Sequence, residues 1–135
     1  MKVDAHLHLN LHQYSPEYLL DYLNKNNIDH CWLLTWEDKD PSIPHLNKRL
    51  PIDKILEIYH AHKDRIIPFY APDPRSPDVE RQFISNINAG VRGCGELKVS
   101  LRWDSTYIDK YLDILSRHDH LPLLFHMESN RDIYM

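Results

Sequence analysis

The stretch Val3-Asp4-Ala5-His6-Leu7-His8-Leu9, near the start of the chain, alternates apolar and polar side chains. A period of two is typical of a β-strand that buries one of its faces. The alternation predicts that the apolar residues of this stretch face covering helices. It also predicts that Asp4, His6 and His8 together face the opposite side.

Strand and helix periods alternate along the rest of the chain. Further strands are expected at residues 28–36, 66–71, 91–99 and 121–127. Four helices are expected between the strands: one capped by Ser15 with Pro16 in its first turn, one through 52–59, one through 79–87 that ends at Gly90, and one that begins at Asp104 or Ser105.

This order of elements is compatible with parallel strand pairing, in either an open doubly wound sheet or a (β/α)8 barrel. A complete barrel usually needs about 250 residues, whereas this chain has 135. The expected fold class is α/β, as the N-terminal half of a parallel (β/α) barrel of the TIM type with about four and a half βα units. Residues 1–135 are expected to form a single domain, truncated after the fifth strand. Its open strand edges predict pairing with another chain, such as a homo-oligomer.

The composition excludes several classes of partner. The chain has 20 acidic and 16 basic residues and a net charge of -4, which argues against binding nucleic acid through a general basic field. No apolar run approaches the roughly 20 residues of a membrane span. Cys31 and Cys94 are far apart and form no CxxC pair, which predicts buried thiols in a reduced, cytoplasmic chain. A membrane partner is not expected and a nucleic-acid partner is disfavoured; the enzyme interpretation developed below expects a small-molecule substrate.

His6 and His8 are the first metal-ligand candidates. Residues two apart on a strand lie on one face, roughly 6 to 7 Å apart, so both imidazoles can reach one ion. The same spacing occurs at 60–62 and 118–120, but those triplets fall in the last turns of expected helices and are interpreted as helix-end residues. His6 and His8 instead stand at the carboxyl end of the first strand, where parallel α/β folds place their sites.

Polar side chains also end the fourth and fifth expected strands. Glu96 and Lys98 share one face of the fourth strand, and His126 ends the fifth. Glu96 is a candidate metal ligand. Lys98 is a candidate to pair with Glu96, to hold an anionic substrate, or to bridge two metals after carbamylation. Weaker candidates to line a pocket are His12 and Trp36, which lie just past strand ends.

Four stretches of the chain resemble the amidohydrolase superfamily, most closely its amidohydrolase-related (amidohydrolase 2) branch. Residues 3–9 resemble the first-strand metal motif of that family. Residues 66–75 resemble its third strand with the following turn, residues 90–98 its fourth strand, and residues 121–126 its fifth.

The resemblance implies a (β/α)8 barrel whose mouth binds one or two divalent metals, most often zinc. It implies that His6, His8 and His126 are metal ligands and that Glu96 or Lys98 fills the fourth-strand position with a catalytic role. The implied reaction is attack of a metal-activated water on an amide, ester or lactone carbonyl, or decarboxylation of a small aromatic acid. The family also uses a histidine after the sixth strand and an aspartate after the eighth. Neither is in this sequence, so the chain alone is expected to be inactive.

Two alternatives stand beside this interpretation. A TatD-type metal-dependent deoxyribonuclease shares the first-strand HxH, the Gly95-Glu96 pair and the fifth-strand histidine, but Lys98 and Val99 replace its usual glycine and aspartate. The second alternative is a non-catalytic half-barrel that binds metal or another protein.

Overall fold

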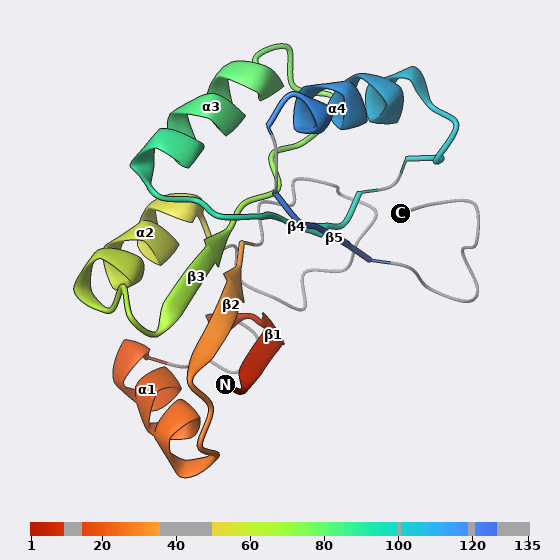
Figure 1. Ribbon diagram of the computed structural model, residues 1–135. Coiled ribbons are helices and arrows are strands. Elements are labelled where there is room, and N and C mark those ends of the chain that lie inside the picture. The colour runs from red at the N-terminus through yellow and green to blue at the C-terminus, as the bar shows by residue number, and fades with distance from the viewer. Residues whose placement is uncertain (10–14, 36–49, 100, 119–120, 127–135) are drawn as a thin grey trace.

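A computed structural model describes residues 1–9, 15–35, 50–99, 101–118 and 121–126. Within these residues, strands and helices alternate as the sequence predicts (Figure 1). The elements are β1 (Val3–Leu7), α1 (Pro16–Lys25), β2 (His30–Leu34), α2 (Ile52–Ala61), β3 (Ile66–Phe69), α3 (Val79–Ala89), β4 (Cys94–Leu97), α4 (Thr106–Ser116) and β5 (Leu123–Phe125). His12 and Trp36 lie outside the described residues.

All strand pairs of the described chain are parallel. β1, β2 and β3 form one sheet in that order, and β4 pairs with β5. A parallel bridge between Phe69 and Gly93 joins the two sheets, so the five strands follow one another in chain order. The four helices lie on one side of these strands (Figure 1). The α/β class is confirmed. The described strands form an open parallel array and do not close into a barrel.

The helix ends follow from local sequence chemistry. Ser15 Oγ accepts a hydrogen bond from the backbone N–H of Tyr18, and Pro16 occupies the first helical position. Ser105 caps α4 in the same way, and Gly90 ends α3 with a positive φ of 128°. No helix in the described part of the chain is long and apolar enough to cross a membrane.

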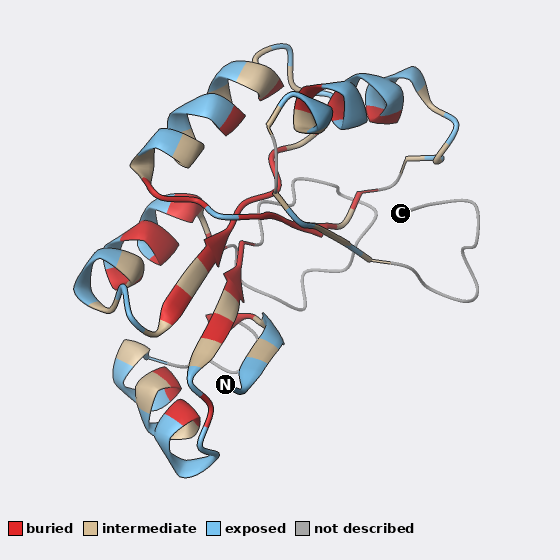
Figure 2. Cartoon of the chain, viewed as in Figure 1, coloured by how far each residue is buried: buried red, intermediate tan, exposed pale blue. Residues whose placement is uncertain are grey.

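The core lies between the strands and the helices, where the facing sides of both are buried (Figure 2). Cys31 and Cys94 belong to it, and burial raises the pKa of both thiols to about 12. Cys94 Sγ also lies 3.0 Å from the hydroxyl oxygen of Tyr111. The prediction that both cysteines are buried is confirmed.

The prediction that Asp4 faces away from the helices, together with His6 and His8, is wrong. Its carboxylate accepts a hydrogen bond of 2.9 Å from the hydroxyl of Tyr22 in α1, so Asp4 faces the helices. The cause is an irregularity of β1: Asp4 pairs with Cys31, but Leu7 pairs with Leu33, so β1 has one extra residue between these pairs. The extra residue shifts the alternation, and Val3, expected to face the helices, is 37% exposed.

Candidate metal centre

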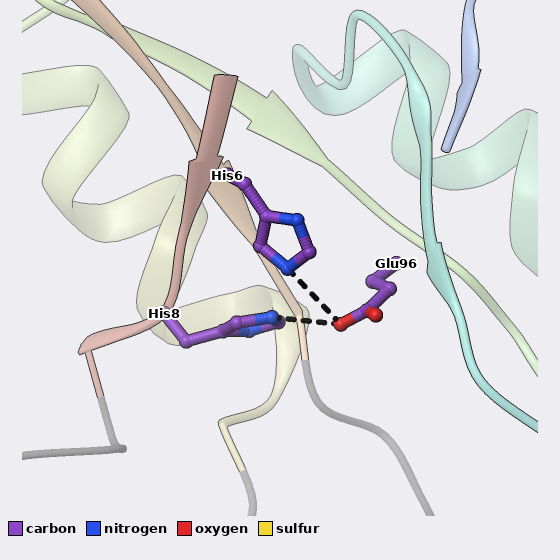
Figure 3. Close-up of side chains that lie close together, drawn as sticks. All are labelled: His6, His8 and Glu96. Carbon is purple, nitrogen blue, oxygen red and sulfur yellow. Dashed lines mark hydrogen bonds and ion pairs between the residues drawn. The ribbon is translucent and has the colours of Figure 1, made fainter. Parts of the chain in front are cut away.

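Three polar side chains predicted from strand ends meet in the structure. His6 lies in β1, His8 directly follows β1, and Glu96 lies near the end of β4. Figure 3 shows the two imidazoles and the carboxylate pointing toward one another. His126, directly after β5, approaches the same carboxylate. We call these four residues the Glu96 cluster.

The two oxygens of Glu96 have different partners. Oε2 lies 2.9 Å from His8 Nε2 and 3.4 Å from His6 Nε2. Oε1 lies 2.7 Å from His126 Nδ1. Ligand atoms of His6, His8 and Glu96 all lie within 4.8 Å of one another, and His126 is not part of this group of three.

The contact between His8 and Glu96 requires a strongly curved sheet. β1 and β4 are three strands apart, which in a flat sheet is roughly 14 Å, or three spacings of about 4.8 Å. Side chains standing perpendicular to a flat sheet would not meet across that span. Because His8 Nε2 lies 2.9 Å from Glu96 Oε2, the sheet must curve so that the face carrying these side chains is concave, as the inner face of a barrel is.

Two glycines let β4 lie close to its neighbours. A Cβ atom on Gly93 would lie 2.3 Å from the ring of Phe69, which stacks on Trp32 with centroids 4.5 Å apart. A Cβ atom on Gly95 would lie 2.8 Å from Leu124 Cβ in β5. These positions therefore need glycine for the close approach that brings Glu96 into the cluster. No close approach was predicted at these glycines, although two glycines within the three residues before a strand-end carboxylate are a signal for one.

The cluster surrounds a charged and buried carboxylate. The side chains of Glu96 and His8 are 3% and 2% exposed, whereas those of His126 and His6 are 26% and 53% exposed. Burial raises the pKa of Glu96. Hydrogen bonds from His8 and His126 and the charges of His8 and His6 outweigh that effect and set the pKa at about 2, below the usual 4.5. In the metal-free protein an ionised carboxylate only accepts hydrogen bonds, so the imidazole N–H groups that face it are the donors; a bound ion would take the place of the hydrogen on its ligand nitrogens.

Glu96 is the fourth-strand candidate whose oxygen meets the two imidazoles of β1. Lys98 lies beyond the end of β4, and its side chain is half-buried. The described histidines of the other two triplets lie at helix ends, and His120 lies outside the described residues. His60 lies in the last turn of α2, His62 caps that helix, and His118 follows the end of α4, as expected for helix-end residues.

The three-residue group suits a divalent ion. With bonds of about 2.0–2.1 Å at tetrahedral angles, neighbouring ligand atoms lie about 3.3 Å apart. The separations of 2.9 and 3.4 Å between the two Nε2 atoms and Glu96 Oε2 are close to that edge length. Two imidazoles with one carboxylate is also a donor set typical of zinc sites that keep a position open for substrate or water.

Neither a protein-family model nor a curated protein sequence matches this chain. Among solved structures, it is similar to a probable 2-pyrone-4,6-dicarboxylic acid hydrolase from Acinetobacter baumannii, crystallised with citric acid bound. The TM-score is 0.66 at 14% identity, and the match covers 96% of this chain and 51% of that chain. The chain therefore spans about half the length of that protein. At this identity the likeness shows the fold alone, an α/β arrangement similar to part of that structure.

Proposed function

We propose that this chain contributes the metal-binding part of a hydrolase site of the amidohydrolase-related type. His6, His8 and Glu96 would hold one divalent ion, with zinc as the ion to test first. The observation that carries the proposal is the convergence of two Nε2 atoms on one buried carboxylate oxygen at the carboxyl ends of β1 and β4. A bound ion would activate a water molecule and polarise the carbonyl that it attacks.

The surroundings of Glu96 favour a ligand role over a proton-carrying role. Both of its oxygens already accept contacts from histidines, and its pKa of about 2 makes it a weak base at neutral pH. A carboxylate that stays ionised supplies a constant negative charge. Its task in the proposed site is thus to hold a cation, together with the two imidazoles.

The charge of the site and its open side favour an anionic substrate. A divalent cation held by one carboxylate and two neutral imidazoles leaves one net positive charge, which attracts a carboxylate or a polarised carbonyl oxygen. His8 and Glu96 are buried, whereas His6 is half exposed, so a substrate would approach past His6. The similar solved structure is named for hydrolysis of a pyrone dicarboxylic acid, which is both a lactone and an anion.

The test is hydrolysis of 2-pyrone-4,6-dicarboxylic acid by the full-length protein, before and after zinc is added to chelator-treated samples. We expect ring opening that depends on zinc and that is lost in His8→Ala. Glu57→Gln is the matched control because that exposed glutamate pairs with Lys54 on the surface of α2. Absence of turnover for lactone, ester and amide substrates by the zinc-loaded full-length protein would refute the hydrolase proposal.

A further inference from the structure

His126 approaches the cluster from a different direction from the two histidines of β1. Its Nδ1 lies 2.7 Å from Glu96 Oε1, whereas His6 and His8 meet the other oxygen. The short distance makes this contact a hydrogen bond between His126 and the carboxylate oxygen that neither histidine of β1 meets.

We propose that His126 is a positioning residue, which holds the Glu96 carboxylate in the orientation that presents Oε2 to the ion. This inference rests on the proposed metal centre and departs from the ligand role that the resemblance implies for His126. In this role His126 forms a hydrogen bond to Glu96, which binds the ion, and does not bind the ion itself. Such bonds to ligating carboxylates raise metal affinity by fixing the geometry of the site.

The backbone of β5 supports this role. The backbone N–H of His126 donates to the carbonyl oxygen of Leu97, the residue after Glu96, at 3.0 Å. The pairing of β4 with β5 therefore places the imidazole beside the carboxylate before any ion binds. Glu96 has three side-chain torsions, and a short charge-assisted hydrogen bond to Oε1 restricts their rotation.

The distances also separate the two roles. The group whose donor atoms lie within 4.8 Å of one another contains His6, His8 and Glu96, and it does not include His126. A single ion bonded to Glu96 Oε2 and both imidazoles of β1 would thus bind without His126.

Two substitutions of His126 distinguish positioning from ligation. The side-chain amide of His126→Asn places an N–H near the position of Nδ1 and has no counterpart of Nε2, whereas His126→Ala has neither group. We expect zinc affinity, measured by calorimetric titration of chelator-treated protein, to fall about 10–100-fold in His126→Ala. In His126→Asn the affinity should stay within about threefold of the unsubstituted protein, because the hydrogen bond that positions Glu96 is kept.

The absorption spectrum of the cobalt-substituted protein gives a second readout, since its visible bands report the ligand set. The bands should keep their shape in both variants. His118→Ala is the control, because His118 contacts the ring of Phe83 away from the cluster, and it should bind zinc like the unsubstituted protein.

The outcomes separate this inference from the metal centre itself. Equal losses of affinity in the Ala and Asn variants, with altered cobalt bands, would make His126 a ligand and overturn the inference while leaving the centre intact. Failure of the unsubstituted protein to bind zinc would refute the metal centre and the role of His126 with it.

Discussion

Replacing Glu96 with glutamine tests the electrostatics of the cluster without any metal. The side chain keeps its size, but the negative charge is lost and an amide N–H group faces imidazole N–H donors. The pKa of Glu96 is about 2 in the folded protein against a usual 4.5. At about 1.4 kcal/mol for each pKa unit, the ionised carboxylate stabilises the folded state by about 3 kcal/mol at neutral pH.

The sign of the pH dependence follows from the direction of this shift. A carboxylate with a lowered pKa in the folded state stabilises the protein above its usual pKa. That stabilisation is lost as the pH falls toward the folded value. Between pH 6 and pH 3, about 2 of the 3 kcal/mol should disappear. The free energy of unfolding of Glu96→Gln should therefore lie about 3 kcal/mol below that of the unsubstituted protein at pH 6 and about 1 kcal/mol below it at pH 3.

The assay is urea denaturation of both proteins in the presence of a chelator, followed by circular dichroism at several pH values. Glu57→Gln is the control. Its glutamate and the paired Lys54 are both mostly exposed, so the change in stability should stay below about 0.5 kcal/mol. A difference between Glu96→Gln and the unsubstituted protein that is small, or that does not vary with pH, would refute the charged, histidine-bonded state of Glu96.

Four further results are expected. Gly93→Ala should lower the free energy of unfolding by about 1–3 kcal/mol or more, because its Cβ would lie 2.3 Å from the ring of Phe69; unchanged urea denaturation would contradict this contact. Cys31 and Cys94 should react slowly with iodoacetamide until the protein is denatured, because burial raises their pKa to about 12; equal rates in both states would contradict burial. Zinc affinity should fall as the solution becomes more acidic, since imidazoles bind metal only when neutral, and a pH-independent affinity would argue against histidine ligands. A DNA oligonucleotide with magnesium should remain intact, whereas its cleavage would favour the TatD-type alternative.

The sequence predicted the order of the elements and the end of the sheet at which the polar groups gather. Both follow from local patterns, namely the apolar period of each segment and the place of His6, Glu96 and His126 at strand ends. The face of Asp4 could not be predicted in this way. An extra residue in a strand leaves the alternation of side chains in the sequence unchanged, and only the pairing with β2 and the bond to Tyr22 reveal it.

The sequence leaves Glu96 and Lys98 as alternative fourth-strand candidates. Glu96 and Lys98 are two residues apart, so an extended strand places both side chains on the same face. The sequence pattern alone therefore does not distinguish them. The curvature of the sheet brings Glu96 Oε2 in β4 to within 2.9 Å of His8 Nε2 at the end of β1, which favours Glu96 in the proposed centre. The curvature depends on tertiary contacts such as the close approach of Gly93 to Phe69. The spacing of apolar residues along the sequence carries no information about such contacts.

The stoichiometry of zinc binding tests the central claim most directly. Chelator-treated protein would be titrated with zinc by calorimetry, beside a variant that carries both His6→Ala and His8→Ala and whose folding is checked by circular dichroism. The Glu96 cluster predicts one ion per chain in the unsubstituted protein and none in the double variant. Zinc binding that is absent from the unsubstituted protein, or equally strong in the folded double variant, would contradict a metal centre at His6, His8 and Glu96.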